Sequence, residues 1–224
     1  MSTDETVGTR LWIEKHPRRI ENAPDVVSTY QHKKITLTAN EFKAVNKYIK
    51  SNKISADALL HAVYAVLLAR LSTTDTLIYG MSSYQKATNN KELLFNGIAP
   101  IKVIISEDLT FSQLLSKTAQ QINKNKISSK LPPEIRYLLL IKNSEKKISK
   151  ADAALDVYRF PLVLLTSKNI FKELSFSYNS AYYHSEDITS LICHFKVILK
   201  SICTEDDLIV NQINILSTSE KNKL

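Results

Sequence analysis

Five histidines and two cysteines are the side chains of this sequence best suited to acid–base or nucleophilic chemistry. A histidine acts as a general base only when its imidazole lies within hydrogen-bond reach of the group that it deprotonates. Cys193 and His194 are neighbours in a predicted helix, so their side chains point about 100° apart, which is poor geometry for a nucleophile and its base. His61 lies inside an apolar helix, where a hydrogen-bonded core histidine is the favoured interpretation. No two histidines are adjacent, and we predict no catalytic residue among them: they are His16, His32, His61, His184 and His194.

The spacing of possible metal ligands and phosphate-binding residues is equally unfavourable. The sequence has no Cys-x-x-Cys and no His-x-x-x-His, the spacings typical of zinc sites, so we predict no metal ligand. Its three glycines, Gly8, Gly80 and Gly97, cannot form a glycine-rich phosphate loop. His184 and Asp187 fall at the start of a predicted helix, where capping is their favoured role. We therefore expect no directly bound cofactor.

Composition limits the class of protein further. At 224 residues with 44% hydrophobic content, the chain can bury a core as one domain, or as one domain with a loose tail. No apolar run reaches the roughly 18 residues of a membrane span, and the polar N-terminus is unlike a secretory signal. The formal net charge is +8, but the excess lysines are scattered rather than interleaved with arginine and exposed aromatic residues. We therefore expect a protein that binds neither nucleic acid nor membrane.

The two cysteines indicate a reducing compartment. Cys193 and Cys203 lie on the same predicted helix, and ten residues at about 1.5 Å each separate them by roughly 15 Å, which is beyond disulfide reach. Reduced thiols are typical of the cytoplasm, which is the location that we predict.

The elements that must position these side chains are clearest in residues 174–203. Apolar and polar residues alternate over 174–179, which predicts a half-buried strand. From Ser185 onward, apolar residues recur every three or four positions, which predicts a long amphipathic helix. Tyr182 and Tyr183 lie between the two elements, and we expect them to pack at this junction.

The same rules predict the remaining elements. Thr38 and Glu41 have the spacing of a capping box at the start of a helix over 39–51. The helix that follows Ser55 and ends at Leu71 is apolar nearly all round, so it is expected at the centre of the domain, with Leu60, Val63, Leu67 and Leu68 buried. Further helices are predicted over 110–123 and 132–141. Strands are predicted over 34–38, 77–80, 98–105, 160–166 and 209–216, and polar loops over 82–92 and 142–155.

The strand ending in Tyr178-Asn179, the aromatic pair and the long helix together resemble the closing segment of the condensation domain of nonribosomal peptide synthetases. Other segments resemble this family's motifs in the same order. FNGIAPIKV resembles Gly-x-Phe-x-Asn-Thr-Leu-Pro-x-Arg with Gly97 in place of the asparagine, and Lys86 stands where the family usually has arginine. KLPPEI and LDVYRFPLV resemble the Leu-Pro-Phe-Glu and Asp-x-Ser-x-x-Pro-Leu-Phe motifs. The matching positions, for which the resemblance implies mostly structural roles, are Gly80, Lys86, Phe95, Gly97, Pro100, Lys102, Leu131, Pro132, Glu134, Asp156, Pro161, Leu162, Tyr178 and Asn179.

The resemblance also implies a fold and a boundary. A condensation domain has two lobes of related fold, and its catalytic motif, His-His-x-x-x-Asp-Gly, lies in the first lobe. This sequence has no such motif, and RLWIEK resembles the segment that leads out of the first lobe. The resemblance therefore implies an α/β fold with a mixed β-sheet and flanking helices, like the C-terminal lobe in the chloramphenicol-acetyltransferase-like superfamily. We expect residues 1–32, with Trp12 as an anchor, to form an extended lead-in, residues 33–216 the lobe, and residues 217–224 a tail or a linker to a following domain.

Several functions are compatible with such a lobe. The leading expectation is a noncatalytic, truncated condensation domain that packs against an adenylation domain of the same synthetase. One alternative is half of a split condensation enzyme, completed by an N-terminal lobe on another chain. Another is a binding module for a carrier protein, whose acidic surface and phosphopantetheine arm would suit the +8 charge. A homodimer is also expected to be possible, since a second copy could take the place of the absent lobe.

Overall fold

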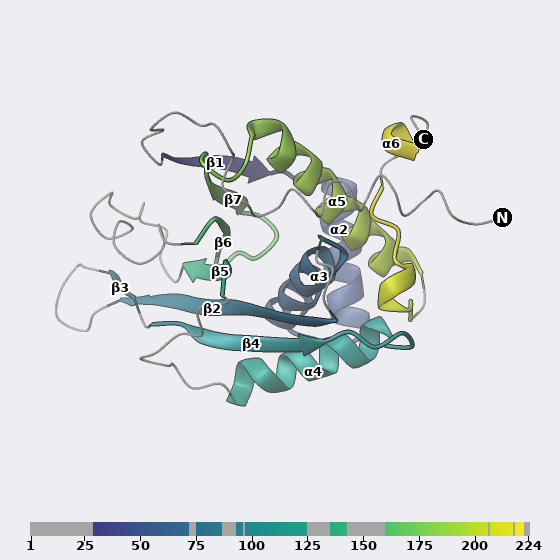
Figure 1. Cartoon of the computed structure of the whole chain (residues 1–224). Coiled ribbons are helices and arrows are strands. Elements are labelled where there is room, and N and C mark those ends of the chain that lie inside the picture. The colour runs from purple at the N-terminus through teal and green to yellow at the C-terminus, as the bar shows by residue number, and fades with distance from the viewer. Residues whose placement is uncertain are drawn as a thin grey trace.

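Seven strands form one mixed sheet in a computed structural model of the chain (Figure 1). The structure describes residues 29–71, 75–86, 93–95, 97–124, 135–142, 160–205, 207–216 and 218–221. The strand order is β1-β7-β6-β5-β2-β3, and β4 pairs with β2 on the same side as β3. The pairs β2–β5 and β5–β6 are parallel and the other pairs are antiparallel. The strands are β1 (Tyr30–Ile35), β2 (Thr76–Lys86), β3 (Leu93–Phe95), β4 (Ala99–Ile104), β5 (Tyr137–Lys142), β6 (Leu162–Ser167) and β7 (Leu174–Asn179).

The described long helices cover one face of this sheet. They are α2 (Ala39–Ser51), α3 (Ala56–Leu71), α4 (Phe111–Lys124) and α5 (Ser185–Thr204). Alternate residues of the central strands, among them Leu139, Leu164 and Phe176, join the buried residues of these helices in the main core. In α3 the four predicted core residues, Leu60, Val63, Leu67 and Leu68, are at most 1% exposed. The prediction that α3 lies at the centre of the domain is confirmed.

The residues that cap the helices act as the sequence predicts. Thr38 Oγ1 accepts a hydrogen bond from the Glu41 N–H at 3.2 Å, and the Glu41 carboxylate accepts one from the Thr38 N–H at 2.6 Å. Ser55 Oγ accepts from the Ala58 N–H at 3.1 Å, within the first turn of α3. Helix α5 begins at Ser185, where the Asp187 carboxylate accepts from the His184 N–H at 2.8 Å.

The helix predicted over residues 132–141 is wrong, because the chain forms strand β5 there (Tyr137–Lys142). The run Leu138-Leu139-Leu140-Ile141 has no periodicity that distinguishes a buried helix from a buried strand. β5 lies between β2 and β6 with parallel pairing on both sides. Leu139 is buried in the main core and Leu138 and Leu140 in a smaller cluster on the other face, so β5 carries apolar residues continuously. Long-range pairing therefore decided the structure of this segment.

The strand predicted over residues 209–216 is also wrong. This segment contains a short 3₁₀ helix, η2 (Val210–Gln212), and a single bridge between Ile209 and Thr110. Its apolar side chains Val210, Ile213 and Ile215 are 0–2% exposed in the main core. This burial requires the apolar residues that also characterise a buried strand, although the backbone of the segment forms only a single bridge.

Three smaller expectations also need correction. The polar segment 82–92, predicted as a loop, is strand as far as Lys86, because β2 continues along β5 and β3. The strand at 174–179 was predicted to be half-buried, but Ser177 and Asn179 are 1% and 6% exposed. Ser177 lies opposite Val163, which belongs to a second, smaller apolar cluster on the other face of the sheet. β1 also begins earlier, at Tyr30, than the predicted strand over 34–38.

The segment that follows α5 is attached to the ends of α3 and α4. The Phe111 N–H donates to the Leu208 carbonyl, and the Val210 N–H donates to the Leu109 carbonyl, both at 2.8 Å. Arg70, in the last turn of α3, donates to the Asn211 carbonyl at 2.9 Å. Hydrogen bonds to residues far earlier in the chain, 141 positions earlier for Arg70, therefore hold this segment against the ends of α3 and α4.

We expect Asp207→Ala to destabilise the protein by about 0.5 to 1 kcal/mol at neutral pH. The first turn of α4 has no acidic residue of its own, and Asp207 Oδ1 accepts from the Ser112 N–H at 2.9 Å. This backbone hydrogen bond lowers the pKa of the Asp207 carboxyl. Because the folded-state pKa is below the unfolded one, the contribution is present above the usual carboxyl pKa and is lost as the pH falls through the lowered value.

Urea denaturation of the wild type and of Asp207→Ala at a series of pH values measures this contribution. Glu205→Ala, two residues away and exposed, is the matched control and should have little effect. Equal effects of the two substitutions would contradict the capping role of Asp207.

None of the described helices is by itself long and apolar enough to span a membrane. Helices α2 and α3 pass such a test only when taken together, and they are bent by 114° where they meet.

Candidate functional site

A buried network of polar aromatic side chains lies between α3 and the sheet. His61 Nδ1 lies 3.0 Å from the Tyr79 hydroxyl, and Tyr64 packs edge-on against the Tyr79 ring with centroids 5.5 Å apart. His61, Tyr64 and Tyr79 are all 0% exposed. Burial lowers the pKa of His61 to about 3, and burial raises the pKa of Tyr79 above its ordinary value. At neutral pH the network therefore carries no charge.

This geometry confirms that His61 is a hydrogen-bonded core histidine. A general base must reach the proton that it abstracts, and the His61 ring is enclosed by the core. Among the described residues, His61 Nε2 has no hydrogen-bond partner, so part of the imidazole is left unsatisfied in an apolar environment.

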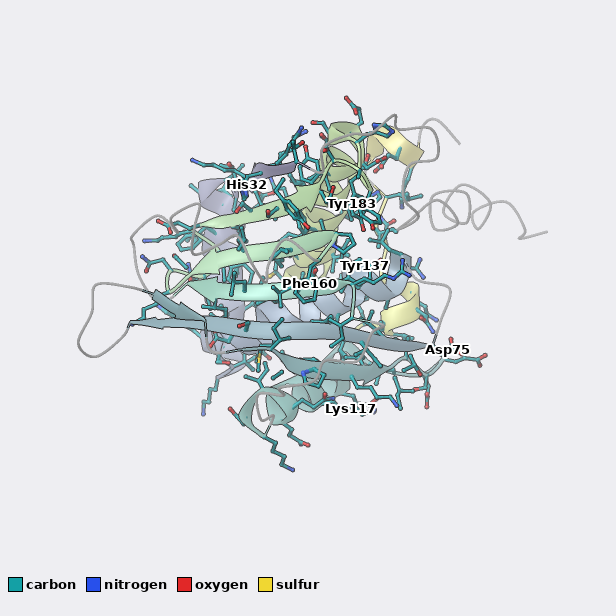
Figure 2. The ribbon with its side chains drawn as sticks, turned by 60° about the vertical axis from the view of Figure 1, so that its left-hand side comes forward. His32, Asp75, Lys117, Tyr137, Phe160 and Tyr183 are labelled. Carbon is teal, nitrogen blue, oxygen red and sulfur yellow. The ribbon has the colours of Figure 1, made fainter. Side chains whose placement is uncertain are left out.

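The network continues toward the start of α5. Tyr137 and Tyr183 are hydrogen-bonded to each other, and burial is the main cause of the raised pKa of both hydroxyls. Figure 2 shows Tyr137 on the sheet and Tyr183 at the end of β7. Tyr183 is 2% exposed, so packing at the strand–helix junction, the favoured interpretation of this residue, is confirmed.

The other described histidines are spread over two elements of the fold. His32 lies on β1 opposite Ser177, and His184 precedes the first turn of α5. His194, on α5, places Nε2 3.0 Å from Glu220 Oε1 of the short helix α6 (Thr218–Lys221). Cys193 is exposed, and burial raises the pKa of the Cys203 thiol to about 11. The Cys203 thiol is therefore protonated and a weak nucleophile.

Three of the positions selected by family resemblance lie on the sheet face opposite the long helices. We call this face, which carries Leu138, Leu140, Val163 and Leu165, the second face. Alternation along β2 and β4 places Gly80, Pro100 and Lys102 on the second face, and Gly80 lies directly opposite Pro100. Residues from two separate motifs of the sequence are therefore neighbours across one strand pair.

Gly80 is required by close packing. A Cβ atom at this position would lie 2.7 Å from Ile98 Cγ2 and 3.0 Å from Leu138 Cδ1. We expect Gly80→Ala to destabilise the protein by about 1 to 3 kcal/mol, the usual cost of overpacking a core. Chemical denaturation measures this change.

The double variant Gly80→Ala/Ile98→Ala is the control for this prediction. It removes the atom that the new methyl group meets at 2.7 Å, so the two single costs should add to more than the cost of the pair. Strictly additive costs would mean that the contact with Ile98 is not the cause.

A second group of family positions forms one corner of the sheet. The Asn179 N–H donates to the Pro161 carbonyl at 3.0 Å, and Leu162 lies opposite Tyr178 in the β6–β7 register. Asn179 Oδ1 accepts from the Ala181 N–H at 2.9 Å, which turns the chain toward α5. The Tyr178 hydroxyl donates to Gln31 on β1 at 2.7 Å. These contacts are structural and give the corner no evident chemistry.

The remaining family positions are only partly visible. Lys86 pairs with Leu93 through the backbone, and Phe95 pairs with Tyr84. Gly97 has a φ of 82°, a conformation that favours glycine, and its carbonyl accepts a hydrogen bond from Ser82 Oγ at 2.5 Å. Four positions lie outside the described residues: Leu131, Pro132, Glu134 and Asp156.

Sequence reasoning missed a cleft of about 510 Å³ at the end of the sheet where β1 leads into α2. The cleft is bounded by the segment from Lys34 to Phe42 and by the β6–β7 connection from Leu165 to Ser175. Its wall contains hydroxyl groups, two phenyl rings and the cation of Lys172, which lies 5.6 Å from the centre of the Phe42 ring. Phe171 has a φ of 68°, which is unusual for a side chain of this size. No local sequence signal could reveal this cleft, because its walls are far apart in the chain.

Similar proteins place this geometry in context. No protein-family model matches the chain. A plipastatin synthase polypeptide of Bacillus subtilis (strain 168) is 22% identical over 203 residues, with 75% of this chain and 8% of that protein covered. The first condensation domain of the CDA synthetase superposes with a TM-score of 0.61 at 8% identity, covering 93% of this chain and 52% of that chain. The chain has the fold of one lobe of a condensation domain.

Two further structures share the condensation-domain lobe fold. The structure of the X-domain from teicoplanin biosynthesis in complex with OxyB gives a TM-score of 0.64 at 13% identity, covering 84% of this chain and 49% of that chain. AB3403, a four-domain nonribosomal peptide synthetase bound to AMP and glycine, gives 0.63 at 11% identity, covering 99% of this chain and 21% of that chain. The chain thus spans about half the length of the X-domain match and a small part of the multidomain proteins. The α/β fold with a mixed sheet and flanking helices, which the resemblance implied, is confirmed.

Proposed function

We propose that this chain is a noncatalytic, C-terminal condensation-domain lobe that serves as a structural platform for an adenylation domain of a nonribosomal peptide synthetase in the cytoplasm. The fold of one lobe and the similarity to a plipastatin synthase support a place in such a synthetase. The enclosed, uncharged His61 supports a noncatalytic role, since this histidine cannot reach a substrate amine.

The observation that carries the platform role is the attachment of residues 207–216 to the ends of α3 and α4. The Asp207 carboxylate accepts a hydrogen bond from the first turn of α4, and Arg70 donates one to the Asn211 carbonyl. Leu208 and Val210 form backbone hydrogen bonds with Phe111 and Leu109. A domain joined after this segment would start from a fixed position on the lobe rather than from a free tail. Such a connection restricts the orientations that a following domain can take, which lowers the entropy cost of a contact between the two domains.

The test uses this chain, the adenylation domain encoded in the same synthetase, and donor and acceptor carrier proteins loaded with their amino acids. We expect calorimetry to show binding between the chain and the adenylation domain, and intact-mass analysis to show no condensed product. Absence of binding would contradict the platform. Product above the no-protein control that is lost on substitution of a histidine in this chain would contradict the noncatalytic role.

The same assay distinguishes the split enzyme. An N-terminal lobe that carries the His-His-x-x-x-Asp-Gly motif is added on a second chain. Product that appears only with both chains would favour the split enzyme over the platform.

A second candidate function, carrier-protein binding, is favoured by the exposed surface of α2. Lys43, Lys47 and Lys50 lie at helical spacing on this surface, all exposed, and Lys53 follows in the next turn. Such a ridge would attract an acidic carrier protein, with the phosphopantetheine arm as the attached group. Binding that weakens with salt and with Lys43→Glu/Lys47→Glu, while the adenylation domain still binds, would support this candidate.

A further inference from the structure

Strand β4 forms an edge of the sheet along which only some backbone groups face outward. In an antiparallel pair, alternate residues bond the partner strand and the residues between them direct their N–H and C=O groups to the free side. The Ile105 N–H donates to the Asp75 carbonyl at 2.8 Å, so Ile105 and every second residue before it bond toward β2. Pro100, Lys102 and Ile104 are therefore the outward-facing residues of this edge.

The side chain of Gln121, from the last part of α4, occupies this edge. Gln121 Oε1 accepts from the Lys102 N–H at 2.9 Å, and Gln121 Nε2 donates to the Lys102 carbonyl at 2.5 Å. One carboxamide thus makes both hydrogen bonds that a residue of an added strand would make. Lys102 is exposed, so these groups would otherwise be hydrated, and the bonds are not needed to satisfy a buried backbone.

The sequence of α4 gives no packing reason for a glutamine at this position. Leu114 and Thr118 are buried at helical spacing against the sheet, and position 121 continues the same stripe. An apolar residue would be ordinary there, whereas Gln121 reaches past the core to the edge of β4. Gln120, its neighbour, is exposed and points about 100° away from Gln121 around the helix.

Other residues at the two edges of the sheet also affect whether a further strand can pair there. Pro100 has no N–H, so it cannot donate to an added strand. Ile104, at 59% exposed, is the one exposed large apolar side chain among the described residues. β1, the strand at the other edge of the sheet, carries the consecutive charges Lys33 and Lys34, a common protection against edge-to-edge pairing.

We propose that Gln121, together with Pro100, closes the β4 edge against strand pairing with a second copy of this chain. In the pairing that is prevented, two β4 strands meet antiparallel about a two-fold axis, with Lys102 of each opposite Ile104 of the other. The pair would exchange N–H···O=C bonds at these residues and cover the exposed Ile104 side chain. The carboxamide of Gln121 prevents this pairing because it is already hydrogen-bonded to the Lys102 N–H and C=O groups.

The test compares Gln121→Met with Gln120→Met in the full chain by sedimentation equilibrium between about 1 and 100 μM, a range in which micromolar contacts are populated. Both substitutions add one methionine to α4 and keep good helix propensity. We expect Gln121→Met to tighten self-association about tenfold or more relative to the wild type, and Gln120→Met to leave it unchanged. Any dimer formed through another surface would be common to all three proteins and would cancel in the comparison.

Two further measurements make the outcome specific. Adding Ile104→Lys to Gln121→Met should return self-association to the wild-type level, because a charge on an edge strand opposes pairing. Thermal unfolding checks that every variant is folded. Equal self-association of folded Gln121→Met and wild type would overturn the proposal, as would an increase that Ile104→Lys does not reverse.

Discussion

The free energy of unfolding should fall by roughly 2 to 3 kcal/mol between pH 7 and pH 4.5 through the protonation of His61 alone. Burial lowers the pKa of His61 from 6.5 to about 3 in the folded protein. Below pH 6.5 the unfolded chain binds a proton at this site and the folded protein does not, so stability is full above pH 6.5 and declines until the pH reaches about 3. Each pH unit in that window costs about 1.4 kcal/mol.

His61→Phe removes the titrating group and keeps an aromatic ring in the core. The Tyr79 hydroxyl retains a second acceptor, the backbone carbonyl of residue 61, at 3.4 Å. The carboxylates of the chain also titrate in this range, so the quantity to measure is the difference between the two proteins in urea denaturation from pH 4.5 to 7.5. The variant should lose less stability on acidification than the wild type. Parallel pH profiles would show that folding does not lower the pKa of His61.

Leu67→Ala should destabilise the protein by about 2 to 5 kcal/mol, which approaches the whole stability of many domains. Leu67 is 0% exposed on α3, where residues from Ala58 to Leu68 are buried on every side of the helix. Removing its branched end leaves a cavity between α3 and its neighbours, and the close packing around α3 limits the collapse of that cavity. Denaturation in urea or by heat gives the change directly.

Ile104→Ala is the matched control for Leu67→Ala. It removes a similar number of carbon atoms from a side chain that is 59% exposed, so its effect should stay below about 1 kcal/mol. A cost below about 1 kcal/mol for Leu67→Ala as well would mean that α3 is not the central helix of the folded protein.

Much of the helical structure was determined by short-range signals in the sequence. The capping box of Thr38 and Glu41 starts α2 because both partners lie within one turn of each other. The recurrence of apolar residues every three or four positions predicted α5 from Ser185 for the same reason. β7 was found at its correct bounds from its alternation. The order of the family motifs then indicated the condensation-lobe fold before any strand pairing was known.

Short-range patterns did not determine the structure of two apolar segments of the chain. An apolar run such as Leu138–Ile141 is compatible with a buried helix and with a buried strand, and only the parallel neighbours β2 and β6 decided between them. The segment around Val210 has the apolar content of a strand, but its backbone hydrogen bonds go to Leu109 and Phe111 about 100 residues earlier.

For the candidate site, the sequence identified residue types and the tertiary structure decided which of them meet. Gly80 and Pro100 were selected from separate motifs, and the β2–β4 register made them neighbours. The hydrogen bonds from Gln121 to Lys102 and the cleft beside Phe42 had no counterpart in any sequence pattern. The physical reason is common to all three: the fold decides which distant segments come into contact, and a local pattern of residue types carries no information about that choice.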